Sequence, residues 1–220
     1  MRQEPLFQRT KGHIGTDESG KGDYFGPLVA AGVFVPEGQD DVLRELGVRD
    51  SKKISDKRVR EIAETIKLGF VHSVVAIGPD KYNSLYEKMR NLNRMLAWAH
   101  ARVIENILAE VDCGQVVTDQ FGDEMFVRNA LMKKGKDIEL IQRTKAEDDP
   151  AVAAASILAR AEFLKRLYFL GQDAGMDLPK GASNLVEEAA CRLVREKGEN
   201  ALALYAKLHF KTTKKILAAV

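Results

Sequence analysis

Residues 14–27 of the chain read IGTDESGKGDYFGP, from Ile14 to Pro27. Two adjacent acids, Asp17 and Glu18, end a short apolar run, and two glycines flanking a lysine follow at once. A second apolar run covers residues 28–35. Because side chains alternate between the faces of a strand, one acid can point into a site while the other reaches it only where the strand turns. Glycines at such a turn let backbone N–H groups approach a phosphate.

Besides a cation-binding site, three other interpretations of this stretch are considered. Its residues are also typical of a polar turn between two strands. The spacing from Gly15 to Lys21 matches a Walker A loop, but Gly22 stands where that loop needs Ser or Thr to hold Mg²⁺, and two acids would lie where anionic phosphates bind. The dinucleotide pattern G-x-G-x-x-G fails because three residues separate Gly22 from Gly26. The acids are better interpreted as ligands for a cation.

The composition is that of a soluble globular protein with one α/β domain. The chain has 220 residues, of which 45% are hydrophobic and 30% charged, with a formal charge of +2. A nucleic-acid partner would therefore need basic residues gathered on one face. Cys113 and Cys191 lack metal-ligand spacing and are expected to be buried free thiols. Without an apolar span or a signal peptide, we expect a cytoplasmic monomer with no membrane contact.

Hydrophobic periodicity predicts alternating strands and helices within a single domain, residues 1–220. Residues 1–11 are expected to be loose, 36–54 to form a polar connection, and 183–220 to form a helical, basic C-terminal part. Ser55, Asp149 with Pro150, and Asn184 with Glu187 are predicted helix starts. The predicted strands are about 12–18, 28–35, 70–77, 115–119 and 137–141. The predicted helices are 55–67, 79–86, 93–110, 124–134, 151–170 and 184–197.

This order predicts a mixed sheet in which the first three strands form an antiparallel meander. The 93–110 helix is then a crossover that brings strand 115–119 parallel to an earlier strand. If that neighbour is strand 12–18, Asp17 and Asp119 end adjacent strands about 4.8 Å apart. Glu147 can lean towards the same edge from a loop. Asp148 and Asp149 are alternative ligands, although helix capping explains Asp149.

Converging carboxylates repel one another unless cations lie between them. Oxygen ligands suit Mg²⁺ or Mn²⁺, and two such ions can clamp both the attacking water and the leaving oxygen of a phosphodiester. The histidines have no metal-ligand spacing with these acids, so each is assigned a structural or surface role. They are His13, His72, His100 and His209.

Ordered blocks from about Gly12 to Lys215 resemble the type 2 ribonuclease H family, and specifically its ribonuclease HIII branch. In the HII branch an arginine separates the two glycines and the fourth acid is an aspartate, whereas this chain has Lys21 and Glu147. The blocks that carry the resemblance are residues 15–27 (GTDESGKGDYFGP), 50–53 (DSKK), 91–93 (NLN), 96–101 (LAWAHA), 119–121 (DQF), 144–147 (TKAE), 153–157 (AAASI), 178–181 (LPKG) and 206–211 (AKLHFK).

The resemblance implies an RNase H-like α/β fold, with a mixed five-stranded sheet flanked by helices and a helical C-terminal extension. It also implies an endonuclease that cleaves the RNA strand of RNA–DNA hybrids with Mg²⁺ or Mn²⁺, two ions being bound with substrate, and leaves 3′-hydroxyl and 5′-phosphate ends. Asp17, Glu18, Asp119 and Glu147 match the family's catalytic, metal-binding acids. Gly20, Lys21 and Gly22 match its backbone-contacting motif at the scissile site.

Substrate contacts are expected from basic residues along the chain. Stacking near the site is a candidate role for Tyr24 and Phe25, with core packing favoured for Phe25. The expected substrate-binding residues are Lys21, Ser51, Lys52, Lys53, Lys145, Lys180, Lys207, Lys211, Lys214 and Lys215.

Members of the HIII branch usually carry an extra N-terminal substrate-binding domain, and about ten loose residues are expected there instead. An HII-like ability to cut at single ribonucleotides in duplex DNA is therefore left open. The alternatives from other classes are a non-catalytic hybrid-binding module and another metal-dependent nuclease or integrase-like enzyme on the same fold.

Overall fold

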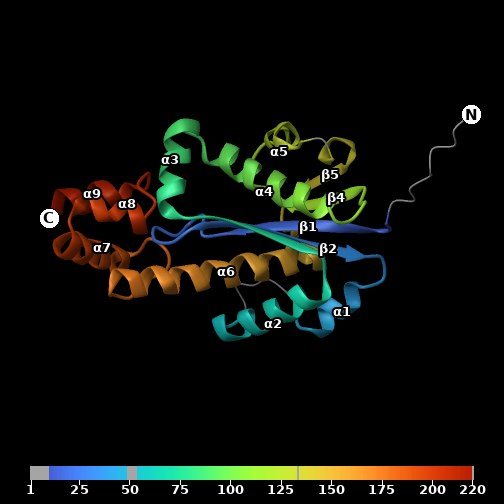
Figure 1. The fold of residues 1–220 in the computed structure, drawn as a ribbon, viewed down its shortest axis with the longest axis horizontal. Coiled ribbons are helices and arrows are strands. Elements are labelled where there is room, and N and C mark those ends of the chain that lie inside the picture. Colours follow the sequence, from blue (N-terminus) through green and yellow to red (C-terminus); the bar gives the residue numbers. More distant parts are fainter. Residues whose placement is uncertain (1–9, 49–53, 133, 220) are drawn as a thin grey trace, which may run out of the picture.

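The computed structural model describes residues 10–48, 54–132 and 134–219, in which a five-stranded mixed sheet lies between two layers of helices (Figure 1). The strand order is β3-β2-β1-β4-β5. β1 pairs antiparallel with β2 and parallel with β4, β2 pairs antiparallel with β3, and β4 pairs parallel with β5. The strands are β1 (Gly12–Ser19), β2 (Leu28–Pro36), β3 (His72–Ile77), β4 (Gln115–Asp119) and β5 (Glu139–Arg143).

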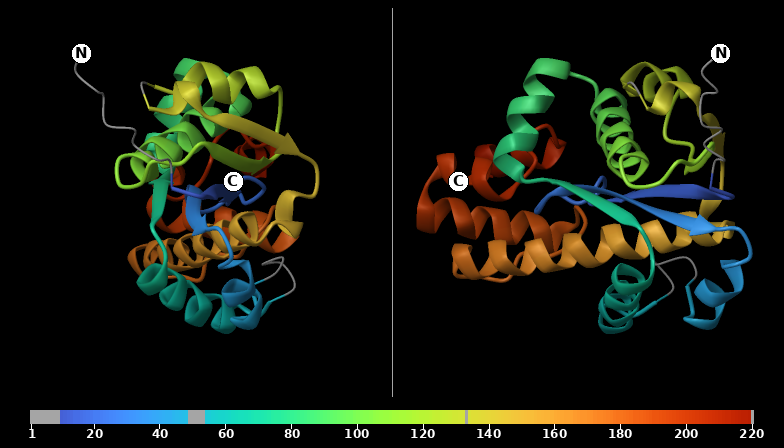
Figure 2. Two further views of the ribbon diagram at one scale, coloured as in Figure 1. Left: turned by 90° about the vertical axis from the view of Figure 1, so that its right-hand side faces the viewer. Right: turned by 45° about the vertical axis from the view of Figure 1, so that its right-hand side comes forward.

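Helices cover both faces of this sheet and one of its ends (Figures 1 and 2). One face is covered by α1 (Asp40–Glu45), α2 (Asp56–Gly69) and α6 (Pro150–Ala174). The other face is covered by α3 (Pro79–Met89), α4 (Leu92–Leu108) and α5 (Glu124–Ala130). The C-terminal helices are α7 (Asn184–Lys197), α8 (Leu202–Tyr205) and α9 (Lys211–Ala219), and the 3₁₀ turns are η2 (Gly135–Asp137), η3 (Ala146–Asp148) and η4 (Glu199–Ala201).

β2 shows why the sheet needs helices on both faces. Val29, Ala31 and Val33 belong to the core under α6, whereas Leu28 and Ala30 belong to the core under α4. A strand that is apolar at every position has no face to turn to water. On β1, a Cβ on Gly15 would lie 2.2 Å from the backbone of Ala151 and Val152. Glycine is therefore required for α6 to lie directly against the strand.

Most predicted elements are present, including the antiparallel meander, the parallel β1–β4 pair and the Ser55 and Asp149 caps. The expected buried thiol of Cys113 is confirmed, while Cys191 is half-buried, and both cysteines are free. Among the described residues, no helix is both long and apolar enough to cross a bilayer.

Several boundaries were predicted wrongly. β5 starts two residues later than expected, because residues 135–137 form a 3₁₀ turn. The connection 36–54 contains the six-residue helix α1, which buries only Leu43 and has no side-chain cap to mark its start. The Asn184 capping box does not form, since Ser183 is the N-cap and Asn184 is already helical. α5 ends at Ala130, and α6 runs on to Ala174, where Gly175 ends it with a φ of 73°.

Candidate active site

The four acids singled out in the sequence line one cavity at the end of β1 and β4. The parallel pairing of these strands aligns Thr16 with Thr118, so Asp17 and Asp119 both follow the last paired residues. Glu18 comes next on β1. Glu147 lies in η3, between β5 and α6, rather than in an irregular loop.

The cavity has a volume of about 690 Å³ and is walled by one face of α6. The helix contributes positions spaced by four residues, which lie on one side of an α-helix. The glycine loop that follows β1 also lines the cavity. The lining residues are Asp17, Glu18, Ser19, Gly20, Lys21, Gly22, Asp23, Asp119, Glu147, Val152, Ser156, Arg160, Phe163, Leu164 and Lys180.

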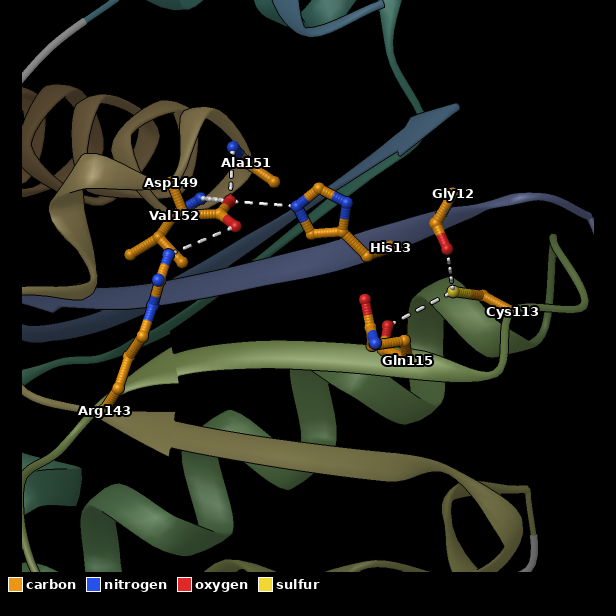
Figure 3. Close-up of polar contacts among 8 residues, drawn as sticks. All are labelled: Gly12, His13, Cys113, Gln115, Arg143, Asp149, Ala151 and Val152. Carbon is orange, nitrogen blue, oxygen red and sulfur yellow. Dashed lines mark hydrogen bonds and ion pairs between the residues drawn. The ribbon is translucent and has the colours of Figure 1, made fainter. Parts of the chain in front are cut away.

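α6 is fixed in place by Asp149, its N-cap residue (Figure 3). The Oδ1 atom of Asp149 accepts hydrogen bonds from the amides of Ala151 (2.9 Å) and Val152 (3.3 Å). The same oxygen lies 2.9 Å from His13 Nε2 on β1, and Oδ2 lies 3.6 Å from Arg143 on β5. One carboxylate thus connects two strands to the start of the helix that forms the cavity wall.

Asp17 is held in a setting that disfavours its charge. Burial is the main cause, and the neighbouring Glu18 carboxylate adds to it, so the pKa of Asp17 rises to about 6. Hydrogen bonds from Ser156 and from the Glu18 amide, 2.8 Å from Asp17 Oδ1, act in the opposite direction. A carboxylate whose charge is poorly compensated by the protein is a suitable ligand for an added cation.

In contrast to Asp17, the surroundings of Glu18 favour its charged form. Burial raises its pKa, but hydrogen bonds from His100 and Lys21 outweigh burial and leave the pKa below its usual value. His100 is fully buried, with Nε2 donating to Glu18 Oε2 at 3.2 Å and Nδ1 lying 2.9 Å from Thr16 Oγ1. Lys21 Nζ lies 3.4 Å from Glu18 Oε1. Glu18 is therefore anionic and fixed in direction.

The donor set fits a hard divalent cation, since all four cavity acids offer oxygen. Within the described ranges, no three His, Cys, Asp or Glu residues are close enough together to enclose a metal ion. Mg²⁺ in proteins keeps several waters and binds one or two carboxylates together with substrate phosphates.

The glycines of the loop have different roles. Gly20 has a φ of 86°, and a Cβ there would lie 2.2 Å from the Pro27 carbonyl oxygen. The fold itself therefore requires Gly20. At Gly22 a Cβ would meet no atom within 4 Å, and the residue is exposed. Gly22 leaves the backbone open to an approaching ligand.

The predicted substrate contacts are only partly brought together. Lys21 and Lys180 line the cavity, and Lys180 Nζ also bonds Asp56 at 2.7 Å. Lys145 is exposed two residues before Glu147. Lys211, Lys214 and Lys215 are exposed on α9 and do not line the cavity. Ser51, Lys52 and Lys53 lie outside the described residues.

The prediction that Lys207 contacts substrate phosphates is wrong for this structure. Its side chain is fully buried, and Nζ donates to the carbonyls of Asp23 and Gly26. Tyr24 is also fully buried, with its hydroxyl 3.1 Å from Thr213 Oγ1, and Phe25 packs in the core as favoured. Neither ring offers a stacking face at the surface.

Three lining or supporting residues were missed. Ser156 and Arg160 stand four residues apart in an otherwise alanine-rich helix, and this polar pair on one face was the available signal. His100 was assigned a general structural or surface role, yet it supports Glu18 from α4. Nothing in its local sequence marks this contact, because it joins residues 82 positions apart.

The chain is similar to known proteins over most of its length. A family model described as ribonuclease HII matches residues 14–213. Ribonuclease HIII of Protochlamydia amoebophila is 48% identical over 208 residues, which cover 94% of this chain and 69% of the relative. Ribonuclease HIII of Chlamydia muridarum is 44% identical over 216 residues, which cover 96% of this chain and 71% of the relative.

Solved structures are similar over the same region. The crystal structure of Bst-RNase HIII in complex with Mn²⁺ has a TM-score of 0.87 at 34% identity, covering 96% of this chain and 70% of that one. The crystal structure of Aquifex aeolicus RNase H3 has a TM-score of 0.75 at 36% identity, covering 92% and 74% of the two chains.

Proposed function

The chain belongs to the type 2 ribonuclease H family as an endoribonuclease H of the ribonuclease HIII type, and on this basis we propose how it acts. The substrate is an RNA–DNA hybrid, whose RNA strand is hydrolysed with a divalent metal ion to leave 3′-hydroxyl and 5′-phosphate ends. The observation that supports this proposal is that Asp17, Glu18, Asp119 and Glu147 line one cavity together with the glycine loop.

The four acids have two kinds of role in this proposal: three are metal ligands and one assists them. Asp17, Asp119 and Glu147 would hold Mg²⁺ or Mn²⁺, and Glu18 would assist from beside them, either as a further ligand or by orienting the ribose 2′-hydroxyl. Two bound ions would supply an activated water and stabilise the 3′-oxygen as it leaves. The Asp119 carboxylate is held for this by the Ala146 amide, 3.2 Å from Oδ1. That amide also joins Asp119 to the turn that carries Glu147.

The backbone of residues 20–22 recognises RNA. The 2′-hydroxyl is the group by which RNA differs from DNA, and open backbone amides can bind it directly. Lys21, Arg160 and Lys180 line the same cavity and place positive charge near the path of the phosphates. Asp56 orients the last two, since Arg160 and Lys180 bond to its two carboxylate oxygens.

The test is a substrate panel run with Mg²⁺ and with Mn²⁺. An end-labelled RNA–DNA hybrid, a DNA duplex and a duplex with a single ribonucleotide are compared, and the product ends are identified by their mobility before and after phosphatase. Asp119→Asn is expected to lower hybrid cleavage at least about 100-fold. Asp123→Asn is the matched control, because asparagine also caps helices and Asp123 caps α5 outside the cavity lining.

The outcomes separate the competing functions. Metal-dependent cutting of the hybrid by the wild type and the control, but not by Asp119→Asn, supports the proposal. Binding of the hybrid without cutting in all three proteins favours the non-catalytic module. Cutting of the DNA duplex favours another metal-dependent nuclease, and incision at the single ribonucleotide extends the activity towards that of ribonuclease HII.

A further inference from the structure

Lys207 is a buried cation that belongs to the C-terminal part of the chain but bonds to the loop after β1. Its side chain is fully buried, and Nζ donates to the carbonyl oxygens of Asp23 (2.7 Å), Gly26 (2.8 Å) and Phe25 (3.5 Å). Nζ also lies 5.7 Å from the centre of the Tyr82 ring. An ammonium group has three donors and no acceptor, so three carbonyls match it fully.

The same stretch is bonded to the loop through its backbone. The Gly26 amide donates to the Tyr205 carbonyl (2.9 Å), and the Lys207 amide donates to the Tyr24 carbonyl (2.9 Å). Phe25 and Ala206 form an isolated antiparallel bridge between them. Residues 205–207 are therefore held along the whole of residues 24–26, about 180 positions earlier in the chain.

These contacts extend to the loop that lines the cavity. The Asp23 amide points back to the Gly20 carbonyl at 3.4 Å, while the Asp23 carboxylate accepts from the Gly181 amide at 2.6 Å. A Cβ on Gly20 would lie 2.2 Å from the Pro27 carbonyl oxygen, so that residue has little freedom. Movement of the carbonyls at 23 and 26 would carry Gly20–Gly22 with them.

A buried ammonium is expensive to place in a protein interior, since it gives up its hydration. Burial accordingly lowers the pKa of Lys207 to about 7, with Asp23 the charged group that opposes this. An apolar side chain of similar length would avoid that cost but would leave the carbonyl oxygens of Asp23 and Gly26 without this donor. The ammonium group therefore loses its hydration and, in exchange, orders a loop whose position matters for the proposed reaction.

We propose that Lys207 is a positioning residue, whose ammonium group ties residues 205–207 to the carbonyls of residues 23–26 and so sets the position of the Gly20–Gly22 backbone against the RNA strand. This rests on the proposed function for the role of that backbone. Two other roles for Lys207 predict different results. A phosphate contact would act on substrate binding, and a purely structural role would act on stability alone.

The experiment compares Lys207→Met with the wild type in the full chain. The substitution removes the ammonium group and keeps an unbranched side chain. Lys81→Met is the matched control, because it makes the same change at an exposed lysine of α3, next to Tyr82. The kcat and KM for a labelled RNA–DNA hybrid, the salt dependence of hybrid binding, and amide hydrogen exchange along the chain are measured well below the unfolding temperature.

The expected result is a fall in kcat of about 10- to 100-fold with KM changed less than about twofold, because a displaced backbone misaligns the reacting groups. The slope of binding against salt should stay as in the wild type, and exchange should rise at residues 20–26 but not at 14–18. A raised KM with a shallower salt slope would instead identify a phosphate contact. Unchanged kcat and KM, or exchange that rises equally across β1, would identify a purely structural role; each overturns the proposal.

A second variant covers the case in which Lys207→Met does not fold. Lys207→Gln keeps two donors without the charge, and it is expected to fold and to cleave with a reduced kcat and an unchanged KM. If neither variant folds, Lys207 serves the fold alone and the proposal is wrong. If the wild type cleaves no hybrid, the proposed function fails instead, while the exchange pattern still tests the tie between residues 207 and 23–26.

Discussion

Two half-buried aspartates contact the same helix, α6, and the protein shifts their pKa values in opposite directions. Asp149 caps the helix and lies beside His13 and Arg143, and although burial raises its pKa, the bonds from His13 and from the amides of Val152 and Ala151 bring it below its usual value. Asp17 faces Ser156 one to two turns further along, and burial together with Glu18 raises its pKa to about 6. Only the first carboxylate is compensated within the chain.

The difference separates two parts of the molecule. We call the surroundings of Asp149 the structural end and the surroundings of Asp17 the chemical end. At the structural end, the Asp149 carboxylate is paired with His13 of β1 and Arg143 of β5, and these contacts join the sheet to α6. At the chemical end, burial and the Glu18 carboxylate disfavour the charge of Asp17, whereas Glu18 itself is compensated by His100 and Lys21. The setting of Asp17 costs stability when the carboxyl is charged, and under the proposed function a bound cation would offset this cost. Four variants test this contrast between the two ends.

The largest effect on stability is expected at the structural end. Asp149→Ala removes the cap of a 25-residue helix and leaves His13 and Arg143 without their shared anion, so we expect a loss of about 2–3 kcal/mol in the free energy of unfolding. Denaturant titration at pH 6 measures it. Asp148→Ala, at an exposed neighbour, should stay within about 0.5 kcal/mol. Equal losses for the two variants would contradict the assigned role of Asp149.

At the chemical end, removing a charge should stabilise the metal-free protein. The folded-state pKa of Asp17, about 6, lies above the unfolded value of 3.8, so its stability cost builds up as the pH rises from about 3.8 through about 6 and is complete at pH 8. Asp17→Asn avoids this cost. The change in pKa from 3.8 to about 6 corresponds to about 3 kcal/mol at about 1.36 kcal/mol per pKa unit, and solvent screening at this half-buried carboxyl lowers the expected gain at pH 8 to about 2 kcal/mol.

The gain should disappear near pH 4, where Asp17 is protonated in the folded state, and hybrid cleavage should be lost at every pH. Addition of Mn²⁺ should raise the melting temperature of the wild type but not that of Asp17→Asn. A lower melting temperature for the variant in metal-free buffer at pH 8 would count against the interpretation of Asp17 as an uncompensated charge.

A smaller effect is expected from the residue that orients Glu18. His100→Leu removes the bond to Glu18 Oε2, and residues behind metal ligands typically contribute about 10- to 100-fold in metal affinity. The Mn²⁺ concentration for half-maximal cleavage should therefore rise at least about tenfold. His72→Leu, on the edge strand β3, should leave that concentration unchanged. An unchanged metal requirement in His100→Leu would show that Glu18 acts without this support.

The smallest effect is expected at His13, where the contribution of its charge can be separated from that of its hydrogen bond. The hydrogen bond to Asp149 raises the pKa of His13 against burial, so the stability it contributes is complete below about pH 6.5 and is lost as the pH rises through the raised value. His13→Gln keeps a donor but no charge and should cost about 0.5–1 kcal/mol at pH 5.5 and nothing at pH 9. A cost that is the same at both pH values would show that the charge is irrelevant.

Much of the fold follows from signals that are local in the sequence. The strand patterns, the Ser55 cap and the Asp149-Pro150 helix start lie within a few residues of the structures they specify. The boundaries of β5 and α5 were missed because a 3₁₀ turn and an early helix end leave no strong pattern of capping residues or glycine.

The order of residues along the chain was enough to identify the four acids, the glycine loop beside them and a strand order that could bring them to one edge. Only the tertiary structure shows which residues support that edge. They are Ser156 and Arg160 on one face of α6, His100 behind Glu18, and Lys207 beneath the loop rather than on the surface. The reason is physical: whether a charged side chain is buried or exposed depends on segments that pack against it, and for Lys207 those lie 181 and 184 positions away.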